Sequence, residues 1–172
     1  MRRVAIIASA SGNGKTTLGR RLAQRLDVPF VEVDSLVHGP NWQETSDEDL
    51  RRELEPILAS DGWVIDGPYF RKLGTVVIDA ADAVVWLDLP TRVWFLRLFR
   101  RTVRRLTGRE RIWNDNKESL TTAFWGRESL FGYALSQQYK RRQVWPRLLS
   151  RYSMVRLRSR DEVERWFAGV LR

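Results

Sequence analysis

Short apolar runs and longer stretches with apolar residues three or four positions apart follow one another along the chain. Apolar runs of about four to eight residues predict β-strands, whereas the three- and four-residue spacing predicts amphipathic helices. The predicted strands cover residues 3–8, 30–34, 62–66, 83–90 and 154–159. The predicted helices cover residues 15–26 and 91–106, and two more begin near Thr45 and near Asp161.

Local signals refine the helix that begins near Thr45. The Thr45 hydroxyl can cap the first turn while Glu48 reaches back toward it. Pro56 predicts a kink or an early stop in the same helix, because proline lacks the amide hydrogen that a helix interior needs.

The order of these elements predicts the fold class. Strands that are apolar throughout and alternate with helices predict an α/β fold, with helices on both faces of a parallel sheet. Residues 1–172 are expected to form a single domain. Residues 107–136 hold three glycines and break the strand–helix rhythm. We interpret them as an insertion over the sheet edge or, functionally, as a mobile lid.

Composition narrows the class of protein. The chain is 43% hydrophobic and 30% charged, and it has no apolar run of the roughly 18 residues that predict a membrane span. It has no cysteine, which excludes disulfides and predicts a cytoplasmic location. No signal peptide and no membrane partner are expected. The net charge is +9, and arginine-rich segments at 97–111 and 140–158 predict an attraction to polyanions.

Residues 9–16 read SASGNGKT between a predicted strand and a predicted helix. They match the phosphate-binding pattern GxxxxGK[ST] (Walker A) except for Ser9, and a serine can make the exit from the strand that the first glycine permits. Lys15 is expected to contact the β- and γ-phosphates of ATP, and the Thr16 hydroxyl to bind Mg²⁺. The predicted nucleotide contacts are Gly12, Asn13, Gly14, Lys15, Thr16 and Thr17.

Three aspartates lie at or near the carboxyl ends of predicted strands, where ligands gather in sheets of this kind. Asp34 is expected to orient a hydroxyl acceptor and to act in catalysis, with a helix cap as the alternative. Asp66 is expected to serve magnesium or to line the acceptor pocket. Asp88 is interpreted as a turn residue that caps the next helix.

Positioned arginines stabilise the charge that spreads over the transferred phosphoryl group. Arg101 and Arg105 are predicted to be catalytic, and Arg109 and Arg111 continue the series into the predicted lid. Arg142, with Arg141, is predicted to reach the substrate from a later helix.

Aromatic residues and the single histidine give weaker signals. Trp42, Trp113 and Trp125 lie in polar sequence and could line an acceptor pocket, whereas Trp86 and Trp166 are expected in the core. His38 has no second metal ligand near it in the sequence, so a metal site there is not expected.

Three longer segments carry a family resemblance: ASASGNGKTTLGRRLAQRLDVPFVEVDSL, WVIDGPYFRK and DAVVWLDLPTRVWFLRLFRR. The chain resembles the small adenylate-kinase-like family of topology-modulation proteins, within the P-loop superfamily of nucleoside and nucleotide kinases. The resemblance runs to about Arg105 and resumes at YKRRQVWPRLLSRY and VRLRSRDEVERW.

The resemblance implies a three-layer α/β/α sandwich with a five-stranded parallel sheet of order 2-3-1-4-5 and an arginine-bearing lid. It implies an acceptor-site arginine at Arg71 and an adenine pocket near Ser159 and Arg160. The chain departs from ordinary adenylate kinases because DGPYFRK replaces their Gly-Phe-Pro-Arg stretch, which puts AMP in doubt as the acceptor.

Together these features predict an ATP-dependent phosphotransferase that uses Mg-ATP. The acceptor is left open among a nucleotide, a nucleoside and another small hydroxyl compound, and so is the oligomeric state. The alternative is a nucleotide-dependent regulator that binds nucleic acid through its arginine clusters.

Overall fold

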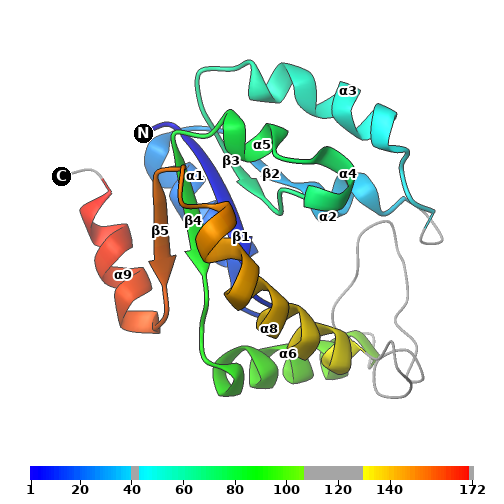
Figure 1. Ribbon diagram of the computed structural model, residues 1–172, viewed down its shortest axis with the longest axis vertical. Helices are drawn as coiled ribbons and strands as arrows, with labels where there is room; N and C mark the ends of the chain where they lie inside the picture. Colours follow the sequence, from blue (N-terminus) through cyan, green and yellow to red (C-terminus); the bar gives the residue numbers. More distant parts are fainter. Residues whose placement is uncertain (40–42, 107–129, 171–172) are drawn as a thin grey trace.

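Five parallel strands form the centre of the molecule (Figure 1). The computed structural model describes residues 1–39, 43–106 and 130–170. The strands are β1 (Arg3–Ala8), β2 (Phe30–Glu32), β3 (Trp63–Asp66), β4 (Ala83–Leu87) and β5 (Met154–Leu157). Their order is β2-β3-β1-β4-β5, which confirms the predicted α/β fold and sheet order.

Helices cover both faces of the sheet, because alternate residues of each strand point to opposite sides. On one face Ile6 and Val85 pack with α1 (Lys15–Leu26) and α9 (Arg160–Gly169). On the other face Ile7 and Trp86 pack with five helices. These are α2 (Val33–Val37), α3 (Asp47–Leu58), α4 (Phe70–Leu73), α5 (Val76–Asp79) and α8 (Leu130–Leu148).

The helix α6 (Thr91–Leu106) lies beyond the carboxyl ends of the strands, as Figure 1 shows for β4. Its buried residues Trp94 and Leu98 pack against Ala10 in the loop after β1 and against Phe131 of α8. This small cluster fixes α6 against the loop that carries the phosphate-binding motif. Among the helices described here, none is long and apolar enough to cross a membrane.

The structure corrects several boundaries, among them the ends of β4 at Leu87 and of β5 at Leu157, which precede the predicted ends at residues 90 and 159. The second strand ends at Glu32, so Asp34 lies in α2. The cap of α3 is Ser46, whose Oγ accepts from the Asp49 amide at 3.0 Å, because the Thr45 hydroxyl donates instead to the Leu36 carbonyl at 2.6 Å. Residues 130–136 of the predicted irregular insertion belong to α8.

Pro56 lies inside α3, which continues to Leu58. A proline in the last turn costs little, since it removes only one of the final helical hydrogen bonds and the helix is about to end. The helix therefore does not stop at Pro56 and ends two residues later, at Leu58.

Candidate active site

The loop between β1 and α1 has the geometry of a phosphate cradle. Gly12 has φ 81° and Gly14 has φ 92°, in the left-handed region that favours glycine. A Cβ atom on Gly12 would lie 2.5 Å from the Trp94 carbonyl oxygen, so α6 leaves no room for a side chain there. The turn directs the chain into the N-terminus of α1 at Lys15, where amide hydrogens and the helix dipole favour an anion.

Ser9, the residue in place of the first glycine, has a structural role. It is not among the residues with positive φ, so this backbone position does not need glycine. Its Oγ donates to Asp88 Oδ1 at 2.6 Å and accepts from Trp86 Nε1 at 2.8 Å. The serine therefore satisfies a buried indole N–H and a buried carboxylate at once.

Asn13 anchors the loop through its side chain, which is 2% exposed. Its Nδ2 donates to the Ala10 carbonyl, and its Oδ1 accepts from the Leu89 amide, each at 2.8 Å. These bonds connect the loop to the segment after β4. Because both polar atoms of the side chain are bonded, the predicted contact of Asn13 with the nucleotide would come from its main-chain amide.

Lys15, Thr16 and Asp66 come together at the mouth of the loop. The Lys15 Nζ lies 3.0 Å from Asp66 Oδ1, and the Thr16 hydroxyl donates to Asp66 Oδ2 at 2.7 Å. The Thr16 hydroxyl also lies 3.2 Å from Glu32 Oε1, at the end of β2. Asp66 is the last residue of β3, beside β1, so the sheet order itself brings the carboxylate to the loop.

The electrostatics of Lys15 depend on these neighbours. Burial alone would lower the pKa of the Lys15 ammonium, but the charges of Asp66 and Asp34 outweigh it, so that the pKa is raised. The charge of Arg101 opposes this rise in the pKa of Lys15. Because the net shift is upward, Lys15 is fully protonated at neutral pH. The catalytic role of Arg101 stays a prediction.

Arg97, one turn before Arg101 on α6, approaches the same loop. A Cβ added at Gly14 would lie 3.3 Å from the Arg97 Nη1 atom. Sequence reasoning counted Arg97 only as part of a charge cluster. Its spacing of four from Arg101 was the available signal, since residues four apart share a helix face. Arg105, a further turn along, is half-buried on α6.

Asp34, Tyr69 and His38 form a second polar group near Lys15. The Tyr69 hydroxyl donates to Asp34 Oδ1 and lies 3.3 Å from His38 Nε2. Burial, followed by the charge of Asp34, raises the pKa of the Tyr69 phenol, so it stays protonated. Sequence reasoning did not single out Tyr69; the signal was a hydroxyl-bearing ring three residues after Asp66, at the carboxyl edge of the sheet.

Asp88 does not cap α6, and the sequence interpretation is wrong on this point. Its carboxylate is 3% exposed and accepts from Ser9, from Arg142 Nε at 2.7 Å and from Arg156 Nη2 at 2.6 Å. Burial would raise the pKa of Asp88, but the bonds from Ser9 and the two arginines hold it below its usual value. With both oxygens taken, Asp88 joins α8 and β5 to the start of the phosphate loop.

The predicted arginines of the acceptor side and of α8 are engaged with the protein itself. Arg142 pairs with Asp88, and Arg141 Nη1 donates to the Ala8 carbonyl at 2.8 Å. Arg71 is 82% exposed and lies 3.4 Å from Glu44 Oε2. Arg160 opens α9, which Ser159 caps by accepting from the Glu162 amide at 3.1 Å. Their predicted ligand contacts stay predictions.

Several sequence predictions concern residues outside the described ranges: residues 107–129 of the lid predicted over 107–136, Arg109, Arg111, Trp42, Trp113 and Trp125. Of the two core tryptophans, Trp86 is fully buried, and Trp166 packs half-buried against the α1 side of the sheet.

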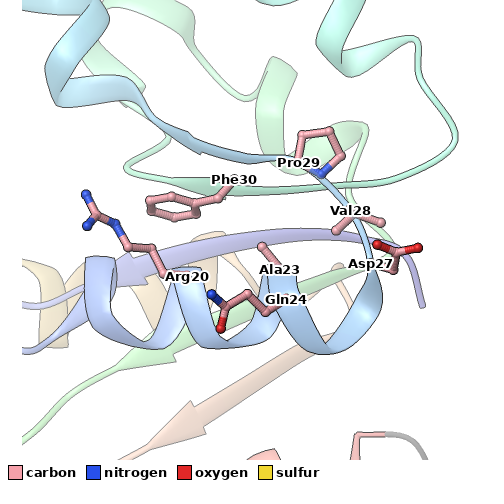
Figure 2. A pocket seen from close by; sticks show the side chains of 7 residues that line it. All are labelled: Arg20, Ala23, Gln24, Asp27, Val28, Pro29 and Phe30. Carbon is pink, nitrogen blue, oxygen red and sulfur yellow. The ribbon is translucent and has the colours of Figure 1, made fainter.

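A separate surface pocket lies toward the C-terminal end of α1, whereas the phosphate loop lies at its N-terminal end (Figure 2). The Phe30 ring crosses α1 here, and a Cβ on Gly19 would lie 2.3 Å from it. The lining residues are Arg20, Ala23, Gln24, Asp27, Val28, Pro29 and Phe30. Only Arg20 connects this pocket with the loop mouth among the described contacts, since its Nη2 lies 3.6 Å from Glu32 Oε2.

Comparisons with known proteins agree with this geometry. A family model described as Shikimate kinase matches residues 11–63. A shikimate kinase from Rippkaea orientalis is 28% identical over 108 residues, 55% of this chain and 58% of that protein. One from Symbiobacterium thermophilum is 31% identical over 97 residues, 48% of this chain and 56% of that protein. The chain spans a little over half the length of these relatives.

Solved structures share the fold over nearly the whole chain. The shikimate kinase of Bacteroides thetaiotaomicron has a TM-score of 0.59 at 19% identity, covering 97% of this chain and 94% of that one. A deoxyadenosine kinase from M. mycoides, solved with bound products, has a TM-score of 0.56 at 12% identity, covering 97% of each chain. At these identities the likeness concerns the fold.

The phosphate loop, the sheet order and these matches place the chain in the P-loop superfamily of nucleotide and small-molecule kinases. The superfamily predicted from the sequence is thereby confirmed. The narrower resemblance to the topology-modulation proteins stays a prediction, because the family model and relatives found here are shikimate kinases.

Proposed function

We propose that this protein is an ATP-dependent kinase that transfers the γ-phosphoryl group of Mg-ATP to a small-molecule hydroxyl group. The observation that carries the proposal is the grouping of the Lys15 ammonium, the Thr16 hydroxyl and the Asp66 carboxylate directly below the glycine turn. A cation and a hydroxyl at a helix N-terminus bind terminal phosphates, and a carboxylate beside them serves the metal. The shikimate kinase relatives support this class of reaction.

The residues at the loop mouth fit magnesium. Thr16 Oγ1, Asp66 and Glu32 offer only oxygen ligands, the kind that Mg²⁺ prefers. In the ranges that the structure describes, no group of three or more His, Cys, Asp or Glu side chains could hold a metal ion by itself. Bound there, Mg²⁺ would supply charge neutralisation to the phosphates.

The remaining residues have distinct roles in the proposed reaction. Lys15 holds the terminal phosphate, and on ATP binding it exchanges part of its contact with Asp66 for phosphate oxygens. Arg101, together with Arg105, stabilises the charge of the transferred group. Asp34 orients the acceptor hydroxyl and receives its proton. The cytoplasmic location and the adenylate-kinase-like character predicted from the sequence belong to the same proposal.

The test is ATP consumption over a panel of nucleotides, nucleosides, sugars and shikimate. Lys15→Ala and Lys15→Arg are both expected to lose at least about a hundredfold in kcat, since a transition-state charge contact is removed or misplaced. Lys15→Arg keeps the ion pair with Asp66, so its loss cannot be ascribed to an unpaired buried carboxylate. Lys140→Ala, an exposed lysine on α8, is the control. Wild-type turnover in both Lys15 variants would contradict the proposal.

The alternative, a regulator that binds nucleic acid, has the charge of +9 in its favour. The comparisons give it no support, because the matched relatives and neighbours cited above are kinases. It requires an affinity for duplex DNA that falls steeply with salt. DNA binding at low salt without any ATP turnover would favour the alternative.

A further inference from the structure

The helix α6 has an apolar row that its packing in the fold does not bury. Trp94 and Leu98 are fully buried and fix α6 against the loop after β1 and against α8. A second row lies one residue further along the chain, which turns it about 100° around the helix. We call this row, with the leucine beside it, the α6 face, and its members are 38–48% exposed: Phe95, Leu96, Phe99 and Val103.

Positive charge gathers on the same part of the molecule. The helices α6 and α8 together contain ten lysine and arginine residues and no aspartate or glutamate. On α6, Arg92 and Arg100 are exposed, whereas Arg97 approaches Gly14 of the phosphate loop. A surface that covers the α6 face therefore leaves the side of the helix that carries Arg97 to the loop.

Large exposed apolar side chains are concentrated on these two helices. Among the residues that the structure describes, nine of the eleven lie here, four on α6 and five on α8. The Phe131 ring of α8 lies 4.9 Å from the Phe95 ring, and the exposed Leu135 and Tyr139 follow Phe131 at four-residue spacing. Figure 1 shows α6 along one edge of the molecule. Single apolar residues on a surface need no explanation, but a contiguous patch of this kind indicates a partner.

An acidic phospholipid surface complements both the charge and the apolar row. Arginines bind lipid phosphates, while phenylalanine and leucine enter the boundary between the head groups and the acyl chains. Nucleic acid would also satisfy the arginines, but aliphatic side chains such as Leu96 and Val103 cannot stack on bases. A second copy of the α6 face would bring like charges together, which is unfavourable.

We propose that the α6 face, together with Arg92 and Arg100, lies on a membrane surface that contains acidic phospholipids, with its apolar side chains at the level of the upper acyl chains. The sequence-based expectation of no membrane partner came from the lack of a membrane-spanning run, and a helix that lies in the interface needs no such run. This contact uses none of the residues assigned above to phosphoryl transfer, so it is independent of the kinase function.

The first experiment measures sedimentation of the full chain with vesicles of phosphatidylglycerol or of phosphatidylcholine. We expect binding to phosphatidylglycerol to be at least about tenfold stronger. Leu96→Ser and Arg100→Gln should each weaken it about fivefold, through lost apolar burial and lost charge respectively. Val76→Ser on α5 and Arg52→Gln on α3 are exposed matched controls and should stay within about twofold of wild type. No binding to phosphatidylglycerol, or binding that Leu96→Ser leaves unchanged, would overturn the inference.

The second experiment uses the absence of cysteine from the chain, because an introduced cysteine is then a unique labelling site. An environment-sensitive fluorophore is attached to Leu96→Cys or, as the control, to Val76→Cys. Phosphatidylglycerol vesicles with a nitroxide on the acyl chain should quench the probe at position 96 at least about twofold and leave the probe at position 76 unchanged.

Other occupants of the α6 face give different results. Equal fluorescence of the two probes with and without quencher means adsorption by charge alone and overturns the inference. Binding of duplex DNA or of polyglutamate without binding of vesicles would assign the face to a nucleic acid or an acidic peptide instead. Self-association that Leu96→Ser abolishes, again without binding of vesicles, would assign it to a second copy of this chain.

Discussion

Replacing Ser9 by the glycine of the usual phosphate-loop pattern is expected to destabilise this protein. Ser9 is fully buried, and its hydroxyl links the Trp86 indole to the Asp88 carboxylate. In Ser9→Gly the indole N–H loses its partner in a site closed to water, and Asp88 loses one of its donors. A sequence comparison alone would predict the opposite, since the change restores the common motif.

The magnitude follows from two contributions. A buried donor left without a partner costs about 1–3 kcal/mol. Glycine also adds about 0.5–1 kcal/mol through the greater freedom of the unfolded chain. Because the φ of Ser9 lies outside the left-handed region, glycine relieves no strain in return. The free energy of unfolding should fall by about 2–4 kcal/mol.

The assay is urea unfolding followed by tryptophan fluorescence. With a slope of about 2–3 kcal/mol/M, a loss of this size lowers the midpoint by about 1 M. Ser9→Ala removes only the hydroxyl, so its difference from Ser9→Gly measures the backbone contribution. Ser60→Gly, at an exposed serine two residues after the end of α3, is the control and should change stability by less than about 1 kcal/mol. A Ser9→Gly protein as stable as wild type would refute the assigned role of Ser9.

Two further predictions concern neighbouring residues. The charged Asp88 carboxylate contributes to the free energy of unfolding above the usual aspartate pKa near 4, and this contribution is lost as the pH falls through the lowered native pKa. Asp88→Asn should therefore be less stable than wild type at pH 7 by about 3 kcal/mol. The difference in the free energy of unfolding between wild type and Asp88→Asn should disappear below about pH 4. A difference that stays constant with pH would contradict the assigned role of Asp88. Gly12→Ala should lower the free energy of unfolding by at least about 2 kcal/mol, because alanine is strained at φ 81° and its Cβ would clash with the Trp94 carbonyl oxygen. The same change should weaken ATP binding in calorimetry. Unaltered ATP affinity would argue against the cradle.

Sequence periodicity predicted the strands because each is buried on both faces of the sheet, and it predicted α1, α3, α6 and α9 because each buries one apolar stripe. It missed the short helices α2, α4 and α5, which have four or five residues each and are too short for a helical period to show. Boundaries failed where side-chain bonds chose between neighbouring residues, as at Thr45 and Ser46. The residues of the phosphate loop were predictable because the motif is contiguous. The group of Asp34, His38 and Tyr69 was not, since their contact depends on how α2 and the segment after β3 fold toward each other.

The two flanks of β1 explain why Asp66 and Asp88 have different surroundings, a difference that the sequence predicted only as a helix cap at Asp88. Asp66 ends β3 and Asp88 follows β4, the two strands beside β1, and both carboxylates contact the phosphate loop. The difference comes from the outer strands: β5 brings Arg156 to Asp88, whereas β2 brings Glu32 toward Asp66. Arg142 completes the neutralisation on the β4 side, so Asp88 has a supporting role.

On the β3 side the charged groups around the phosphate loop are paired, but the lysine among them is accessible. Lys15 faces Asp66 directly, Arg20 Nη2 lies 3.6 Å from Glu32 Oε2, and the charge of Arg101 acts on Lys15. The Lys15 side chain is 24% exposed, whereas Asp88 on the β4 side is 3% exposed and bonded to two arginines. The proposed kinase function therefore puts the magnesium nucleotide on the β3 side, where Lys15 can exchange its carboxylate contact for phosphate oxygens, and leaves Asp88 to structural support.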